Sequence, residues 1–282
     1  MEVIRTVKRL GELVDAARSA GRTIGLVPTM GALHAGHRSL VERARAENDV
    51  VVVSVFVNPT QFNNQDDLRT YPRTEEADCA MLEACGVDYA FVPSVEEVYP
   101  EADTRVFDLG PVAEVMEGAM RPGHFNGVAQ IVSKLFAMSK PTRAYFGEKD
   151  FQQIAVIRRM VELEGFELEI VPCPIVRESD GLALSSRNVR LSAEARQIAP
   201  QIRQKLVKSL DLKAQGYSPV EVARMTEDAI NGVEGLETEY YQIVDAITMQ
   251  PITKWEEAGR CGAVGCVTVY CGGVRLIDNI TY

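Results

Sequence analysis

The sequence has 282 residues, of which 46% are hydrophobic and 25% are charged, a composition typical of globular proteins. This length allows one large or two modest domains, each able to bury a core. The net charge of −10, with only 30 lysines and arginines, argues against broad contact with nucleic acid or an anionic membrane, since both need clustered cations. Any anionic ligand must therefore meet a local cluster of donors.

The N-terminal residues and the cysteines favour a cytoplasmic chain. Residues 1–10 carry three basic side chains without a following apolar run, unlike a secretory signal. The longest apolar stretch, residues 50–57, is too short to cross a bilayer. The six cysteines form no CxxC pair, and none lies at zinc-ligand spacing from the three histidines. We interpret them as free thiols in a reducing compartment.

Apolar periodicity predicts alternating helices and strands through the first two thirds of the chain. The first group is a helix at 6–20, a strand at 23–27, a loop at 28–36, a helix at 37–47 and a strand at 49–57 that is buried on both faces. Further helix–strand pairs are expected at 77–85 and 87–92, at 128–138 and 143–146, and at 154–164 and 168–172. This alternation predicts an α/β fold with a Rossmann-like, doubly wound parallel sheet and right-handed crossovers.

The pattern changes near Asn188. A charged helical stretch is expected at 192–212, and Ser218-Pro219-Val220-Glu221 is a capping box that opens another helix. A strand is expected near 241–244, and the strands expected at 264–270 and 274–280 flank a hairpin turn at 271–273. We therefore predict a catalytic domain over 1–187 and a smaller α+β C-terminal domain over 188–282.

The most informative segment is Pro28–His37, which lies between a strand and a helix where open α/β folds bind ligands. The start of a helix attracts phosphate through its amides and its dipole. His34 and His37, three residues apart, are expected to face the same way, and Gly36 leaves room for a ligand. Their imidazoles can donate hydrogen bonds to phosphoryl oxygens with most benefit in the transition state. The alternative is that they cap the helix or pack in the core; zinc is disfavoured because no third ligand is evident nearby.

Two further clusters carry charge or hydroxyls after a strand or turn. In Gly147–Asp150, Lys149 can act as a point charge on a triphosphate, although such a segment can also be a plain charged turn. In Leu184–Arg187, two hydroxyls and a guanidinium can clamp a departing pyrophosphate, although a solvated loop has the same composition. Three clusters on the expected ligand side of one fold favour phosphate chemistry.

The HxGH segment with a distant Ser-Ser-Arg loop resembles the HIGH and KMSKS pair of class I nucleotidyltransferases, which attack the α-phosphate of ATP and release pyrophosphate. Six motifs in order narrow the resemblance to the pantoate–β-alanine ligase family, the pantothenate synthetases. These motifs are PTMGALHAGH, FVNPTQF, YPR, RPGHFNGV, GEKDFQQ and VRESDGLALSSRN. They lie in the first two thirds of the chain, and the tail carries weaker motifs.

The resemblance implies an ATP-dependent ligase that joins (R)-pantoate to β-alanine through a pantoyl adenylate, releasing pyrophosphate and AMP. The implied catalytic residues are His37 as proton donor, His34 as a transition-state contact, Lys149 and Arg187. The implied ATP-binding residues are Met30, Gly31, Ala32, Leu33, His34, Ala35, Gly36, His37, Gly147, Glu148, Lys149, Asp150, Val176, Leu184, Ser185, Ser186 and Arg187.

The same resemblance implies the remaining ligands and partners. Gln61 and Gln153 would hold pantoate, with Gln61 also near β-alanine. Mg²⁺ would be bound by the triphosphate rather than by a protein cage, with Asp78 as a candidate anchor. A homodimer is implied as well.

The residues suit this chemistry, and three rival functions can be weighed against it. Neutral glutamines orient a carboxylate without over-stabilising its ground state, as an arginine fork would. No general base for the amine step is evident, so water or the AMP phosphate could serve. Residues 121–125 are expected to form a buttress or lid near the site, and no chemistry is assigned to His124 within them. The rivals are an adenylyltransferase that keeps AMP on its product, a tRNA-binding synthetase-like module and a non-catalytic nucleotide-binding regulator. The acidic balance opposes the second, and the glutamine pair opposes the third.

Overall fold

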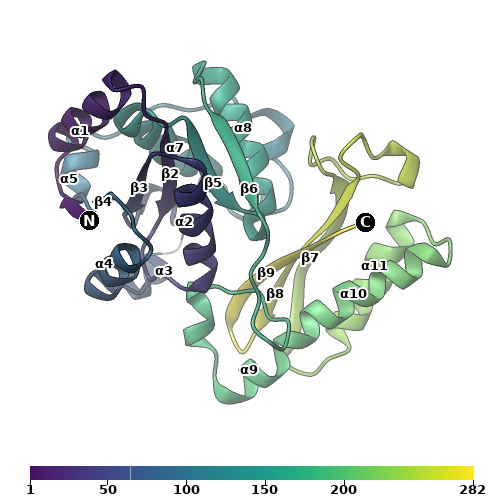
Figure 1. The fold of residues 1–282 in the computed structure, drawn as a ribbon. Helices are drawn as coiled ribbons and strands as arrows, with labels where there is room; N and C mark the ends of the chain where they lie inside the picture. Colours follow the sequence, from purple (N-terminus) through teal and green to yellow (C-terminus); the bar gives the residue numbers. More distant parts are fainter. Residues whose placement is uncertain (64) are drawn as a thin grey trace. The chain divides into compact units, whose positions relative to one another are not determined.

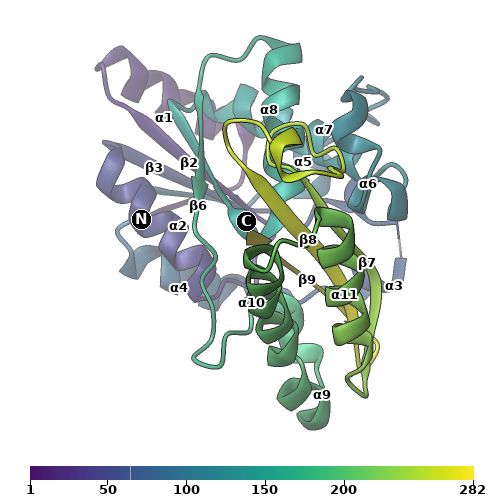
Figure 2. The ribbon, with the colours of Figure 1, turned by 90° about the vertical axis from the view of Figure 1, so that its right-hand side faces the viewer.

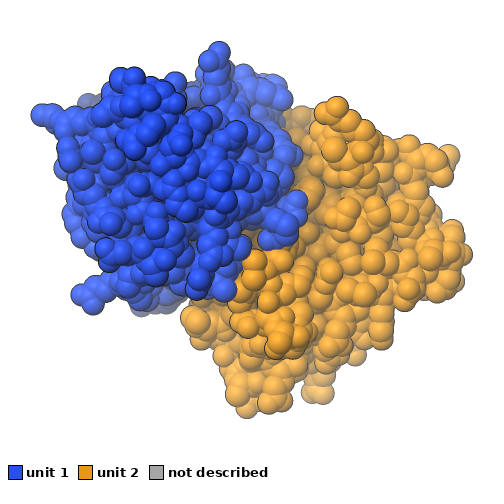
Figure 3. Space-filling view, viewed as in Figure 1, with its two compact units in different colours: residues 1–109, 121–148, 156–174 blue, residues 110–120, 149–155, 175–282 orange. Residues whose placement is uncertain are grey.

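The computed structural model describes residues 1–63 and 65–282. They form two compact units, each described here by itself (Figure 3). Unit 1 comprises Met1–Leu109, Arg121–Glu148 and Val156–Pro174, and unit 2 comprises Gly110–Met120, Lys149–Ala155 and Ile175–Tyr282. The domain boundary expected at residue 188 stays a prediction, and the compact units divide the chain elsewhere.

Unit 1 is built on a six-stranded parallel sheet, which confirms the predicted fold class (Figure 1). Its strand order is β1-β4-β3-β2-β5-β6. The strands are β1 Glu2–Ile4, β2 Ile24–Thr29, β3 Val50–Val55, β4 Tyr89–Phe91, β5 Arg143–Gly147 and β6 Glu169–Cys173. The first five residues of β3 are all buried, as expected for a central parallel strand covered on both faces.

Helices cover both faces of this sheet. The helices that contribute to unit 1 are α1 Val7–Ser19, α2 Ala35–Glu47, α3 Gln65–Thr70, α4 Glu75–Ala84, α5 Val95–Val98, α7 His124–Ser139 and α8 Phe151–Glu164, with the 3₁₀ turn η1 Pro59–Gln61. Helices α2 and α4 share one apolar core with the sheet through residues such as Val41, Leu82 and Val53. Helices α1 and α7 pack together over β2 from the other side (Figure 1).

Unit 2 is built on a three-stranded antiparallel sheet in the order β7-β8-β9. Its elements are β7 Leu236–Asp245, β8 Ala263–Cys271 and β9 Val274–Thr281, α6 Glu117–Met120, α9 Ala193–Ile198, α10 Pro200–Ala214 and α11 Pro219–Asn231, and the 3₁₀ turns η2 Gly110–Ala113, η4 Ser186–Arg190 and η5 Trp255–Glu257. Helices α10 and α11 bury residues such as Leu206 and Val222 against one face of the sheet (Figure 2). Met116, from the 110–120 segment, packs with Tyr240 and Val264 in a second core.

Most expected elements are confirmed, with shifted ends. The capping box at Ser218 is present: its side chain accepts from the Glu221 amide, and the Glu221 carboxylate accepts from the Ser218 amide. The helical stretch expected at 192–212 is confirmed and consists of two helices, because Pro200 lacks an N–H and begins α10 after the short helix α9. Among the described residues, none of the helices has the length and apolarity needed to cross a membrane.

Candidate active site

The loop after β2 has an unusual backbone that begins at Thr29. The Thr29 hydroxyl donates to the Ser54 carbonyl of β3 at 2.6 Å and accepts from the Gly31 amide at 3.2 Å. Gly31 and Ala32 then both have positive φ angles, 78° and 50°. A left-handed conformation is rare for a residue with a Cβ, so Ala32 must be held there by its surroundings.

A buried carboxylate from α4 holds this loop. Asp78 is only 2% exposed, and its Oδ2 accepts from the Ala32 amide at 2.9 Å. Its Oδ1 accepts from the Leu33 amide at 2.8 Å and from the Thr74 hydroxyl at 3.1 Å. No local pattern predicts this contact, because 46 residues separate Asp78 from Ala32.

The two histidines cap helix α2 and each other. His34 is the N-cap, and its Nδ1 accepts from the Gly36 amide at 3.1 Å. The Nδ1 of His37 accepts from the His34 amide at 3.3 Å, and the two ring centroids lie 4.1 Å apart. A ring nitrogen that accepts carries no proton, so each neutral imidazole holds its proton on Nε2. The capping role and a donor role therefore use different nitrogens of the same ring.

Gln61 lies beside this loop in unit 1. Its Nε2 contacts the Met30 sulfur at 3.2 Å, and its Oε1 accepts from the Asn58 side chain at 3.1 Å. The Asn58 side chain also donates to the Gly127 carbonyl and accepts from the Tyr99 hydroxyl. The amide of Gln61 is thus oriented with its donor end towards the HxGH loop.

His124, to which the sequence assigned no chemistry, supports Gln61 from α7. Its Nδ1 lies 2.9 Å from the Gln61 carbonyl, and its Nε2 lies 3.2 Å from an Arg121 nitrogen. A carbonyl only accepts and a guanidinium only donates, so His124 carries its proton on Nδ1. The ring is buried, with 7% exposed. These contacts agree with a buttress and keep His124 occupied within the protein.

The HxGH loop and the Gly147–Asp150 segment follow neighbouring strands. Strands β2 and β5 are paired and parallel, so their carboxyl ends lie at the same edge of the sheet. The chain leaves β2 towards β3 on one side and leaves β5 towards β6 on the other. This is the topological switch point at which open α/β sheets bind ligands. Gly147 ends β5 there, and Glu148 begins the turn η3 Glu148–Asp150.

Unit 2 carries the continuation of this segment. The Lys149 ammonium lies 3.2 Å from the Asp150 carboxylate, and its side chain is 19% exposed. The Lys149 carbonyl accepts from the Asn279 side chain of β9 at 3.2 Å. Gln153 is half-buried in the first turn of α8. Its neighbour Gln152 is buried and bonds to the backbone of the 110–120 segment.

The Val176 and Leu184–Arg187 residues also lie together in unit 2. The Val176 carbonyl accepts from the Leu184 amide at 3.0 Å, which closes the turn between them. Ser185 caps the 3₁₀ turn η4 by accepting from the Arg187 amide at 3.3 Å. The turn is anchored to β9 by Arg177, which pairs bidentately with Asp278 at 2.7 and 2.8 Å. The segment is therefore held in place by the protein, which disfavours the alternative of a solvated loop.

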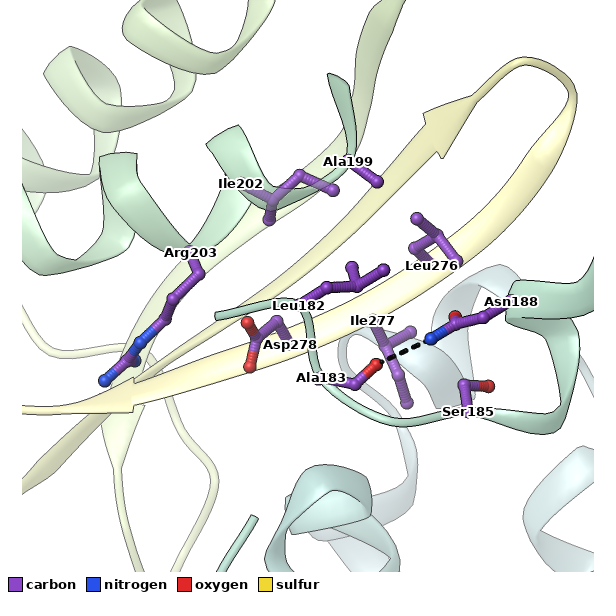
Figure 4. Close-up of a pocket in the computed structure, with 10 residues that line it drawn as sticks. All are labelled: Leu182, Ala183, Ser185, Asn188, Ala199, Ile202, Arg203, Leu276, Ile277 and Asp278. Carbon is purple, nitrogen blue, oxygen red and sulfur yellow. Dashed lines mark hydrogen bonds between the residues drawn. The ribbon is translucent and has the colours of Figure 1, made fainter. Parts of the chain in front are cut away.

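A small cavity lies under this segment (Figure 4). It holds about 10 Å³ and is lined by Leu182, Ala183, Ser185, Asn188, Ala199, Ile202, Arg203, Leu276, Ile277 and Asp278. The Nδ2 of Asn188 donates to the Ala183 carbonyl (Figure 4). Its buried Oδ1 has no hydrogen-bond partner among the residues that the structure describes. A cavity of this size has room for about one water molecule, which could satisfy that oxygen.

A capped HxGH loop at the switch point of a parallel sheet defines an α/β nucleotide-binding enzyme of the HxGH class. The model of the pantoate-β-alanine ligase family matches residues 2–281 of the chain. The chain therefore belongs to the pantoate–β-alanine ligase family.

Individual relatives agree over the full length. The chain is 62% identical to the pantothenate synthetase of Phocaeicola vulgatus, covering 100% of this chain and 99% of that protein. The crystal structure of pantothenate synthetase from Thermus thermophilus matches with a TM-score of 0.91 and 48% identity over 100% of this chain and 99% of that one. The pantoate-β-alanine ligase of Francisella tularensis, complexed with beta-gamma ATP and β-alanine, matches with a TM-score of 0.84 and 35% identity over 100% and 97%.

Family membership makes the chain an ATP-dependent ligase that condenses pantoate with β-alanine. This confirms the function implied by the six motifs. The roles of individual residues stay predictions, and so do the metal, the homodimer and the cytoplasmic location.

Proposed function

We propose that the chain activates pantoate as an acyl adenylate. In the first step the pantoate carboxylate attacks the α-phosphorus of ATP, and the bond to the β-phosphate oxygen breaks to release pyrophosphate. In the second step the β-alanine amine attacks the acyl carbon, forming the amide bond of pantothenate, and AMP leaves. The observation that carries this proposal is the doubly capped HxGH loop at the end of β2.

The two imidazoles supply neutral donors to the phosphates. Because both Nδ1 atoms accept backbone hydrogen bonds, both rings present the proton on Nε2. A neutral donor gains most where negative charge grows, which is on the phosphoryl oxygens in the transition state. This supports the roles implied for His37 as proton donor to the departing pyrophosphate and for His34 as a transition-state contact.

Cationic and hydroxyl donors handle the rest of the triphosphate. The pantoate carboxylate and the triphosphate of ATP are both anions and repel each other, which opposes the first step. Lys149 and Arg187 provide positive charge that reduces this repulsion. The remaining ATP-binding residues are those of Met30–His37, Gly147–Asp150, Val176 and Leu184–Ser186. The capped start of η4 supports a fixed geometry for the last of these segments.

Gln61 and Gln153 bind pantoate. The contact from Asn58 fixes which end of the Gln61 amide donates, and that end is directed towards Met30. A donating amide orients the carboxylate or a hydroxyl while leaving the carboxylate nucleophilic.

Mg²⁺ is bound by the triphosphate and neutralises it. Among the side chains described, no group of three or more His, Cys, Asp or Glu converges as a metal site. Asp78 does not fit as an anchor, because each of its oxygens already accepts a backbone N–H and the side chain is 2% exposed. Coordination by phosphate oxygens and water is the usual arrangement for this ion.

The protein works as a homodimer. The support beyond the resemblance is Val106, an apolar side chain that is 85% exposed. It lies in a segment without regular secondary structure that α7 holds through the Asn126 and Gln130 side chains. Sedimentation should show a dimer, and Val106→Asp should favour the monomer if this segment lies in the interface. A monomeric wild type would contradict the proposal.

Pyrophosphate exchange tests the reaction. Exchange of labelled pyrophosphate into ATP should require pantoate, and adding β-alanine should release AMP. His34→Ala and Lys149→Ala should each lower turnover by on the order of 100-fold or more. Lys208→Ala, at an exposed position of α10, is the control for loss of a lysine ammonium. Near-normal activity in both variants would contradict the site assignment, and pyrophosphate without AMP would indicate an adenylyltransferase.

A further inference from the structure

We propose that Asp78 is a positioning residue that sets the conformation of the HxGH loop, and through it the tautomers and direction of His34 and His37. The inference deepens the proposed function of the loop and rests on it. It replaces the metal-anchoring role expected for Asp78 by one derived from its contacts.

The first argument is the geometry of the carboxylate. Its two oxygens accept from consecutive amides, those of Ala32 and Leu33, at 2.9 and 2.8 Å. Consecutive amides that point the same way form a nest, an arrangement that binds anions. In other nucleotide-binding loops a phosphate occupies such a nest, whereas here the anion is a side chain of the protein. The Ala32 and Leu33 amides are thus committed to Asp78, so ATP must meet these two residues through other atoms.

The second argument is the backbone strain in the same residues. Gly31 and Ala32 have φ angles of 78° and 50°. A Cβ on Gly31 would lie 3.0 Å from the Asp78 Oδ2 and 3.1 Å from a Val55 methyl, so glycine suits both the angle and the space. Ala32 has a Cβ and still adopts the left-handed region, which requires an external restraint. The Asp78 carboxylate, which accepts a hydrogen bond from the Ala32 amide, is that restraint.

The third argument is the position of the nest in the chain. Leu33 is followed directly by His34, the N-cap of α2. The amide of His34 donates to His37, and the ring of His34 accepts from Gly36. A change in the backbone at Ala32 and Leu33 therefore changes the peptide that orients both rings. Release of the loop would allow either ring to move its proton to Nδ1 or to rotate.

Asp78→Asn tests the inference. The amide replaces one accepting oxygen by a donor that would face a backbone N–H, so one of the two contacts is lost. Misplacement of reacting groups by about 1 Å can cost about 100-fold in rate, so we expect kcat for pantoate-dependent exchange to fall by on the order of 100-fold. The fall should be the same at every Mg²⁺ concentration, and the Mg²⁺ concentration for half-maximal rate should not change.

Nitrogen NMR of the histidine rings provides a readout without nucleotide or metal. In the wild type the Nδ1 of His34 and His37 should show the shift of an unprotonated nitrogen, and Asp78→Asn should mix the tautomers. Because this readout needs no turnover, it can fail independently of the proposed reaction. If the wild type lacks the Nε2–H tautomers, the inference is overturned even where the exchange reaction is confirmed.

Three variants control for charge, folding and strain. Glu76→Gln removes an exposed carboxylate from the first turn of the same helix and should leave kcat unchanged. Thr74→Val removes the third hydrogen bond of Asp78 but keeps both amide contacts, so it should lower kcat less than Asp78→Asn does. It therefore tests the inference even if the Asp78→Asn protein fails to fold. Ala32→Gly relaxes the left-handed residue and should restore part of kcat when combined with Asp78→Asn.

Two kinetic outcomes would overturn the inference. A raised Mg²⁺ requirement with normal kcat at saturating Mg²⁺ would make Asp78 a metal ligand. Wild-type kinetics and wild-type ring shifts in a folded Asp78→Asn protein would show that the loop holds its conformation without the carboxylate.

Discussion

The packing of α7 on η1 positions Gln61, and substitution of Gly127 tests that packing. A Cβ on Gly127 would lie 2.5 Å from the Thr60 carbonyl oxygen and 2.8 Å from the Gln61 Cα. Both atoms belong to the backbone, so they cannot turn aside as a flexible side chain would. Gly127→Ala must push α7 and η1 apart. Overpacking of a core costs about 1–3 kcal/mol, and a clash with backbone belongs near the upper end.

Gly11→Ala is the matched control. Gly11 also lies within a helix, α1, but a Cβ there would meet no atom of the described part of the chain within 4 Å. Both exchanges gain about 0.5–1 kcal/mol of helix propensity, so their difference isolates the overpacking cost. At about 2–4 °C for each kcal/mol, a cost of about 3 kcal/mol places the melting temperature of Gly127→Ala about 6–12 °C below that of Gly11→Ala.

The assay combines calorimetric melting with steady-state kinetics. Displacement of η1 moves Gln61, so the KM for pantoate should rise in Gly127→Ala and stay unchanged in Gly11→Ala. Equal melting temperatures in the two variants would refute the packing argument. A lowered melting temperature with an unchanged pantoate KM would refute the link from α7 to Gln61.

Three further predictions concern single interactions. His124→Ala removes a donor to η1 and should raise the pantoate KM about fivefold, the effect of about 1 kcal/mol for one hydrogen bond, with the KM for ATP unchanged in the same kinetics. The hydrogen bond from Arg105 lowers the pKa of Asp103 from 3.8 to about 2, so this carboxylate stabilises the fold above pH 3.8 and loses that contribution as the pH falls towards 2. The free energy of unfolding, measured by urea denaturation, should therefore fall less in Asp103→Asn than in the wild type as the pH drops through this range. An equal fall in the two proteins would contradict the prediction. Asp278→Ala breaks the bidentate pair with Arg177 and should lower the free energy of unfolding by about 3–5 kcal/mol, seen as a lower urea midpoint. An unchanged midpoint would show that the pair does not stabilise the fold.

Local patterns in the sequence predicted most elements of both units. Apolar periodicity located the central strands, because the strand at 50–55 is buried on both faces and needs apolar residues throughout. The capping box at Ser218 can be predicted from the sequence because its two partners lie three residues apart. The break at Pro200 could also have been predicted, since proline has no N–H to continue a helix. The strand β1, Glu2–Ile4, is too short to show an alternation of apolar and polar residues, so periodicity does not predict it.

Contacts between distant residues could not be predicted in this way. Nothing local in the sequence marks the contact of Asp78 with the loop, because an Asp in the first turn of a helix is common for its favourable interaction with the helix dipole. Its partners Ala32 and Leu33 are apolar residues whose side chains give no hint that their amides bind an anion. The support of Gln61 by His124 is similar, since it joins residues 63 positions apart. Such contacts follow from the sheet order, which periodicity alone does not determine.

The histidines show why two interpretations of one motif need not compete. Capping and phosphate binding are alternative interpretations of His34 and His37, yet a ring has two nitrogens and the cap uses only Nδ1. The cap fixes the tautomer that makes Nε2 a donor, so the observed capping contacts agree with the phosphate contacts that we propose for the same rings. The same logic applies to the charge balance of an acidic protein. Because Asp78 occupies the loop's nest with a negative charge, the donors that we propose for ATP in this loop are neutral, and the proposed neutralisation of the triphosphate comes from Lys149, Arg187 and Mg²⁺.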